Sequence, residues 1–87
     1  MTKAEMKECL NMAKRFAELY NTTGLIAFST GMDKEPRIHL TNEAFMQMYE
    51  NGEFHFNTHG YSDVEMYTED EGVTVFTLMD MKGEADE

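Results

Sequence analysis

The feature that most constrains the fold is a change of hydrophobic period between residues 20 and 25. Up to that point apolar side chains recur at i, i+3 and i+4, which predicts one long amphipathic helix. Beyond it, short segments alternate between apolar and polar residues with a period of two, which is typical of half-buried strands. A long helix followed mainly by strands predicts an α+β domain.

The first helix is expected to begin after Thr2, because Glu5 stands three residues later and the two can form a capping box. It should end near Asn21, since Gly24 then lets the chain turn. Its apolar stripe consists of Met6, Cys9, Leu10, Ala13, Phe16, Ala17 and Tyr20.

A second, shorter helix should start at Thr41, where Leu40 and Phe45 can form a hydrophobic staple, and should close at Gly52. Strands are expected at residues 25–30, 37–40, 53–59, 63–68 and 73–79. The predicted order is therefore α-β-β-α-β-β-β, with two helices packed on one face of a small antiparallel or mixed sheet of about five strands. The pattern leaves the order of the strands within the sheet open.

The length of 87 residues predicts a single domain over residues 1–81, followed by a frayed acidic tail at residues 82–87. One cysteine excludes an internal disulfide. No apolar segment reaches the ~20 residues that span a bilayer, and the N-terminal stretch is polar. These features predict a cytoplasmic protein without a membrane partner.

The charge is divided unevenly along the chain. Residues 1–42 carry five acids and six bases, whereas residues 43–87 carry twelve acids and one base, and the total is −10. No Lys or Arg occurs between Ile38 and Met81. Such a field repels nucleic acid and anionic membranes and favours a basic protein partner. Direct binding of nucleic acid is therefore not expected.

The histidines allow two interpretations. His55 and His59 stand four residues apart, with Asp63 four further on, and on a helix this spacing gathers metal ligands. In a strand the same spacing separates the two imidazoles by about 13 Å, which favours solvated histidines on a sheet face. A turn between them, with His39 from a neighbouring strand, is the alternative that would form a metal site. We expect neither a bound metal nor a cofactor.

Catalytic motifs are missing from the sequence, which contains no CxxC, HExxH or GxSxG. Cys9 lies on the apolar stripe of the first helix, where a cysteine behaves as a small hydrophobic side chain. We therefore expect no catalytic residue and no enzymatic activity.

The acidic segment after residue 62 is the core of the predicted partner-binding surface. Alternate strand positions lie ~6.5–7 Å apart, close to the spacing of phosphates along one nucleic-acid strand. Carboxylates in such a row can occupy a groove built for DNA or RNA, and aromatic residues can anchor the contact. The predicted binding residues are Asp63, Glu65, Tyr67, Glu69, Asp70, Glu71, Tyr61, Glu50 and Glu53.

In its size, acidity and methionine content, and in its acidic stretch Glu43–Glu71, the chain resembles small accessory proteins of bacteriophages and mobile elements. Among these are anti-CRISPR and other anti-defence inhibitors. The resemblance implies a protein-binding inhibitor in a bacterial cytoplasm: a nucleic-acid mimic that blocks a basic, DNA- or RNA-binding protein such as a CRISPR effector. An alternative is a non-catalytic regulatory or assembly module that binds another protein through a sheet face or a methionine and aromatic patch. The sequence leaves the oligomeric state undetermined.

Overall fold

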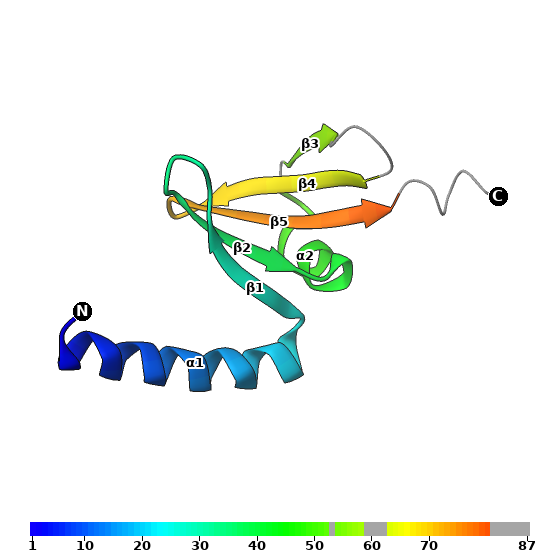
Figure 1. Ribbon diagram of the computed structural model, residues 1–87. Coiled ribbons are helices and arrows are strands. Elements are labelled where there is room, and N and C mark those ends of the chain that lie inside the picture. The colour runs from blue at the N-terminus through cyan, green and yellow to red at the C-terminus, as the bar shows by residue number, and fades with distance from the viewer. Residues whose placement is uncertain (53, 59–62, 81–87) are drawn as a thin grey trace.

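The computed structural model describes residues 1–52, 54–58 and 63–80, apart from the side chains of Asp63 and Asp80. In this part of the chain there are two helices, α1 (Lys3–Thr23) and α2 (Asn42–Tyr49). The strands are β1 (Leu25–Thr30), β2 (Pro36–Leu40), β3 (His55–Thr58), β4 (Asp63–Asp70) and β5 (Val73–Asp80). The predicted α+β class is confirmed, with two helices and a five-stranded sheet (Figure 1). The expected tail at residues 82–87 lies outside the described residues.

The sheet has the strand order β1-β2-β5-β4-β3. Strands β2 and β5 run parallel, and the other neighbouring pairs are antiparallel, so the sheet is mixed. Strand β5 takes the central place because it carries apolar residues on both of its faces, as a strand covered on two sides requires. Strands β1 and β3 form the two edges.

The core lies between α2 and one face of the sheet. Phe45 of α2 is fully buried and packs with Met66 of β4 and Val75 of β5. Partly buried residues surround this centre: Ile38, Leu40, Tyr49, Phe54, Val73 and Met79. The buried hydroxyl of Thr77 on β5 donates a hydrogen bond to the Asn42 side chain at the start of α2, which ties the helix to the central strand.

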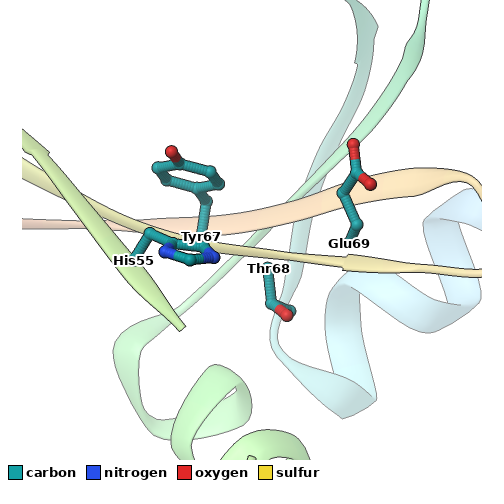
Figure 2. A pocket seen from close by; sticks show the side chains of 4 residues that line it. All are labelled: His55, Tyr67, Thr68 and Glu69. Atoms are coloured by element: carbon teal, nitrogen blue, oxygen red, sulfur yellow. The ribbon is translucent and has the colours of Figure 1, made fainter. Parts of the chain in front are cut away.

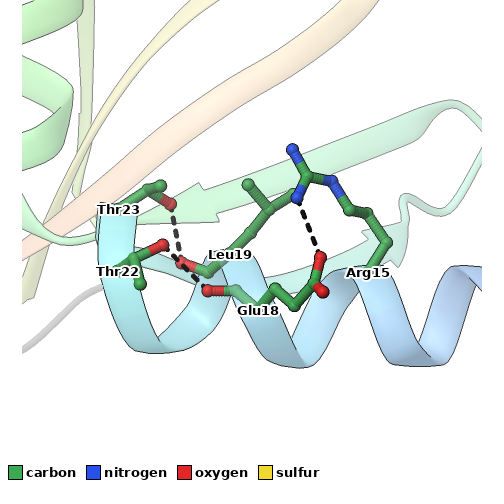
Figure 3. Close-up of polar contacts among 5 residues, drawn as sticks. All are labelled: Arg15, Glu18, Leu19, Thr22 and Thr23. Atoms are coloured by element: carbon green, nitrogen blue, oxygen red, sulfur yellow. Dashed lines mark hydrogen bonds and ion pairs between the residues drawn. The ribbon is translucent and has the colours of Figure 1, made fainter.

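Helix α1 has local side-chain hydrogen bonds at both ends. Thr2 accepts a hydrogen bond from the Glu5 backbone amide at 3.0 Å, and the Glu5 carboxylate accepts one from the Thr2 amide at 2.7 Å, so the predicted capping box is present. At the other end the hydroxyls of Thr22 and Thr23 donate to backbone carbonyls one turn earlier (Figure 3). The capping box satisfies backbone amides that the helix start leaves open, whereas the threonine hydroxyls add a second hydrogen bond to carbonyls inside the helix.

Gly24 sets the direction in which the chain leaves α1. Its φ of 92° lies in the left-handed region, and a Cβ at this position would stand 2.7 Å from the Cβ of Ala44 on α2. Only glycine meets both conditions without strain. The Gly24 carbonyl also accepts a hydrogen bond from the Thr41 amide at 2.8 Å, which holds this junction beside the start of α2.

The expectation that both helices pack on one face of the sheet is met only in part. Phe28 of β1 lies opposite the core residue Ile38, so α1 contacts the same face as α2, but only at the edge strand. No residue of α1 is buried, and Met6, Leu10 and Tyr20 are each about half exposed. The helix meets the sheet at the edge strand β1, where the ring centroids of Phe16 and Phe28 are 5.6 Å apart (Figure 1). The physical reason is that β1 is an edge strand, so α1 reaches only this edge of the sheet and most of its stripe stays exposed.

Candidate binding surface

The register of β4 and β5 decides where the predicted binding residues point. Met66 of β4 lies opposite Thr77 and faces α2, so the odd-numbered residues of β4 lie on the other face, which we call the open face. The odd positions of β4 are Asp63, Glu65, Tyr67 and Glu69. Arg37 and His39 of β2 share this face, because Ile38 between them belongs to the core.

Three of the predicted acids form the tip of the β4–β5 hairpin. Glu69, Asp70 and Glu71, called the hairpin acids below, are all exposed. Asp70 pairs with Val73, so Glu71 and Gly72 form a two-residue turn with φ values of 55° and 80°. Turns of this kind favour Asn and Gly, and a glutamate in the left-handed region is strained. The hairpin therefore holds a carboxylate at its tip at a cost in backbone energy.

Tyr49 joins the end of α2 to this hairpin. Its hydroxyl donates a hydrogen bond to Oδ2 of Asp70 at 2.9 Å. Burial, this hydrogen bond and the negative charges of Asp70 and Glu71 together raise the pKa of Tyr49 to about 12. Glu50 follows Tyr49 directly and is exposed, so it belongs to the same end of the molecule. Two of the hairpin acids, Asp70 and Glu71, thus add to the effect of burial on the Tyr49 hydroxyl.

The loop between β1 and β2 lies at the same end of the sheet, because β2 runs parallel to β5 with Arg37 opposite Thr74 (Figure 1). It contributes the exposed residues Asp33 and Lys34. This end of the sheet therefore combines the hairpin acids and Asp33 with one exposed lysine among the described side chains. The acids outnumber the base at this end. The sequence between Ile38 and Met81 contains no Lys or Arg, and the lysine comes from the β1–β2 loop, which precedes that range.

Glu65 is not available as a free surface carboxylate, contrary to the expectation for this residue. It is 6% exposed, and its Oε2 accepts a hydrogen bond from Nη2 of Arg37 at 2.8 Å. The guanidinium of Arg37 also lies 4.3 Å from the centroid of the Phe76 ring. The row of carboxylates along β4 is consequently interrupted by an ion pair and by Tyr67. The sequence could not reveal this pair, because Arg37 lies 28 residues away and meets β4 only across β5.

The histidines of the described chain serve as ring partners on the open face. His39 stacks on Phe76 with centroids 4.6 Å apart and planes 13° apart, and His55 lies against Tyr67 at 5.3 Å. Burial lowers the pKa of His39, the Glu65 charge opposes that shift, and the Arg37 charge adds to it. Among the described residues no group of three or more His, Cys, Asp and Glu side chains could hold a metal ion. His59 lies outside those residues, so the pairing of His55 with His59 stays untested.

A shallow depression of about 390 Å³ lies along β3 and β4 beside the predicted surface. Figure 2 shows the residues that line it, His55, Tyr67, Thr68 and Glu69. Tyr67 is partly buried, and its ring and that of His55 form one wall. The depression is open to solvent and polar, and it places an aromatic side chain next to one of the hairpin acids.

The structure thus brings together part of the predicted set. The hairpin acids and Glu50 gather at one end, and Tyr67 lies nearby on β4. Tyr61 and Glu53 lie outside the described residues, as does the side chain of Asp63. Sequence reasoning missed the exposed apolar side chains of α1, because an amphipathic stripe looks the same whether its own sheet or another molecule covers it.

The fold and this surface define a small α+β protein with an acidic end and an exposed amphipathic helix. Comparisons with protein-family models, with curated proteins and with solved structures found no match to the chain. Neither described helix combines the length and the apolar character needed to cross a membrane.

Proposed function

We propose that this protein is a non-catalytic inhibitor that binds a basic, nucleic-acid-binding protein, such as a CRISPR effector or another defence protein of a bacterial host, through its acidic end. The observation that carries the proposal is the hairpin tip, where Glu69, Asp70 and Glu71 are exposed and Glu71 occupies a strained backbone position. Strain that persists at one exposed charged residue is characteristic of functional sites.

The hairpin acids can act as substitutes for phosphates. Lysine and arginine side chains that normally hold a nucleic-acid backbone would form charge-assisted hydrogen bonds with these carboxylates. Exposed ion pairs contribute only ~0–1 kcal/mol each, so affinity must also come from desolvated contacts. Tyr67, next to Glu69 in the depression of Figure 2, is the aromatic side chain placed to supply one.

The test compares three versions of the protein as bait in a bacterial lysate. One is the natural chain, and one carries Glu69→Ser, Asp70→Ser and Glu71→Ser. The third is a control with the same loss of charge elsewhere, Glu8→Ser, Glu18→Ser and Glu43→Ser, all at exposed positions. Mass spectrometry should find nucleic-acid-binding proteins retained by the natural and control baits and lost by the hairpin variant.

Two further measurements on the captured partner distinguish mimicry from other binding. A mimic should compete with DNA or RNA for the partner, and its affinity should fall steeply with salt. The hairpin variant should show a shallower salt dependence than the control. If the partner holds nucleic acid and this protein at the same time, mimicry at the hairpin is wrong.

The second candidate function is a regulatory or assembly module that binds another protein through apolar contacts. It is favoured by methionine and aromatic side chains that remain exposed on α2 and β3, namely Met46, Met48 and Phe56. Methionine suits surfaces that adapt to a partner. A partner held in this way would stay bound at high salt and would not distinguish the hairpin variant from the control.

A further inference from the structure

The apolar stripe of α1 is left largely uncovered by the described fold. Two members of the stripe, Cys9 and Phe16, are partly buried, and Phe16 contacts Phe28 of β1, while the rest of the stripe is exposed. The exposed members follow one another at intervals of four, three, four and three residues: Met6, Leu10, Ala13, Ala17 and Tyr20. This spacing is the heptad pattern of a helix that packs along another helix.

Helix α1 is held by local contacts alone over much of its length. These are the capping box at Thr2 and Glu5, the exposed Arg15–Glu18 ion pair at 2.9 Å, and the threonine bonds of the last turn (Figure 3). Exposed pairs of this kind contribute only a few tenths of a kcal/mol. Helices in proteins are stabilised mainly by packing of their apolar face. An exposed stripe of this length therefore indicates a second helix that covers it.

The order of side chains within the stripe fits a second copy of the same helix. The two large residues at the ends of the stripe, Met6 and Tyr20, each lie seven residues from Ala13 in its middle. Two such helices related by a twofold axis near Ala13 would place Met6 of one copy beside Tyr20 of the other. The small side chain of Ala13 allows close approach at the axis.

The charge distribution also favours a second copy, rather than a strongly basic or strongly acidic protein, as the partner of α1. Residues 1–24 contain four bases and three acids, for a net charge of +1 in a chain whose total is −10. The other 63 residues therefore carry −11. Contact through α1 joins two copies by their nearly neutral parts and leaves the strongly acidic parts outside the contact.

The length of α1 allows an extended contact. A helix of 21 residues is about 31 Å long at ~1.5 Å per residue. Phe28 of β1, 55% exposed and in contact with Phe16, widens the apolar surface at one side of the helix. A standard interface buries ~800 Å² per partner, so a stable pair needs contact along the whole helix together with Phe28.

We propose that two copies of this chain pair through α1, antiparallel, about a twofold axis that passes near Ala13. The pairing uses a surface distinct from the acidic end, so each dimer presents two hairpins to partners. The two hairpins are carried on separate sheets and can engage two sites at once.

The first test measures the oligomeric state by sedimentation equilibrium over a wide range of protein concentrations. The natural chain should be a dimer. Leu10→Glu should raise the dimer Kd by at least about tenfold, because it places a charge within the apolar contact. Asn11→Glu, which adds the same charge next along the helix but on its far side, should change the Kd little. Both positions are exposed, so both variants should keep the native circular dichroism spectrum.

The second test fixes the direction of the helices by disulfide formation in a Cys9→Ser background. Ala13→Cys should form a disulfide dimer under mild oxidation, whereas Asn11→Cys should not. Met6→Cys and Tyr20→Cys should each stay monomeric when oxidised alone and should cross-link when mixed. A monomer at every concentration, or equal weakening by Leu10→Glu and Asn11→Glu, would overturn the proposal. Self-cross-linking of Met6→Cys and of Tyr20→Cys would overturn the antiparallel arrangement.

Discussion

Arg37 and Glu65, which lie 28 residues apart in the sequence, form an ion pair across the open face of the sheet. Nη2 and Oε2 are 2.8 Å apart, and the carboxylate side is nearly buried. Phe76 of the intervening strand lies under the guanidinium, 4.3 Å from it. The pair therefore links β2 to β4 over the central strand, and it neutralises one acid of the negatively charged half of the chain.

Arg37→Leu should lower the free energy of unfolding by about 2–4 kcal/mol, because it takes the guanidinium away from a buried carboxylate. Glu65→Leu should cost a similar amount. The double variant Arg37→Leu, Glu65→Leu should recover most of the loss, since buried ion pairs are often replaced by apolar side chains without penalty. Urea denaturation of the three variants checks this prediction. If the loss of unfolding free energy in the double variant equals the sum of the two single losses, the two residues do not act as a pair.

Phe45→Ala should cost about 3–5 kcal/mol of unfolding free energy, because Phe45 is fully buried between α2 and the sheet. Phe56→Ala is the matched control, since Phe56 has the same side chain but is 64% exposed, and it should cost less than about 1 kcal/mol. Thermal denaturation of both variants measures the difference. Equal effects would contradict the placement of the core under α2.

The Tyr49 hydroxyl should lose its proton at a higher pH than an ordinary tyrosine, with a pKa of about 12. The raised pKa means that this group contributes stability in full below pH ~10, and that the contribution is lost as the pH rises through 12. Asp70→Asn should lower the pKa of Tyr49 only in part, because burial is the largest cause of the shift. Carbon-13 NMR of labelled tyrosine Cζ resolves each ring and checks both statements. An unchanged pKa in Asp70→Asn would exclude Asp70 as a cause.

His39 should become protonated only below its usual pKa of ~6.5, because burial against Phe76 disfavours the charged ring. The lowered pKa means that its contribution to stability is present above pH ~6.5 and is lost as the pH falls through the lower folded pKa. Glu65→Gln should lower the pKa of His39 further, since the Glu65 charge raises it. Proton NMR titration of the His39 ring gives the values. A higher pKa in Glu65→Gln would contradict the assigned contacts.

Glu71→Gly should stabilise the hairpin by about 1 kcal/mol, because glycine adopts the φ of 55° without strain. Glu71→Asn should have a smaller effect in the same direction. Under the proposed function both variants should bind the partner more weakly although they are more stable. Glu69→Gln is a suitable comparison, since it removes one charge from a regular strand position and should leave stability nearly unchanged. A loss of stability in Glu71→Gly would contradict the turn geometry.

Local sequence patterns determined most of the elements and their ends. Thr2 and Glu5 predicted the start of α1, and Gly24 predicted its end, because caps depend on residues within one turn of each other. Alternation predicted the faces of β4, with Met66 toward the core and Tyr67 away from it. The exposed hairpin acids followed from the same pattern, since a turn of charged residues between two strands lies at the surface.

Only the tertiary structure decided which of these elements meet. The strand order placed Arg37 within reach of Glu65, so a carboxylate expected to be free is paired and buried. The same order put β1 at the edge, and α1, which precedes β1 in the chain, contacts only this edge and leaves its stripe exposed. The physical reason is that hydrophobic and charge patterns specify which face of an element is apolar or charged but not which surface will cover it. That choice depends on contacts between residues far apart in the chain.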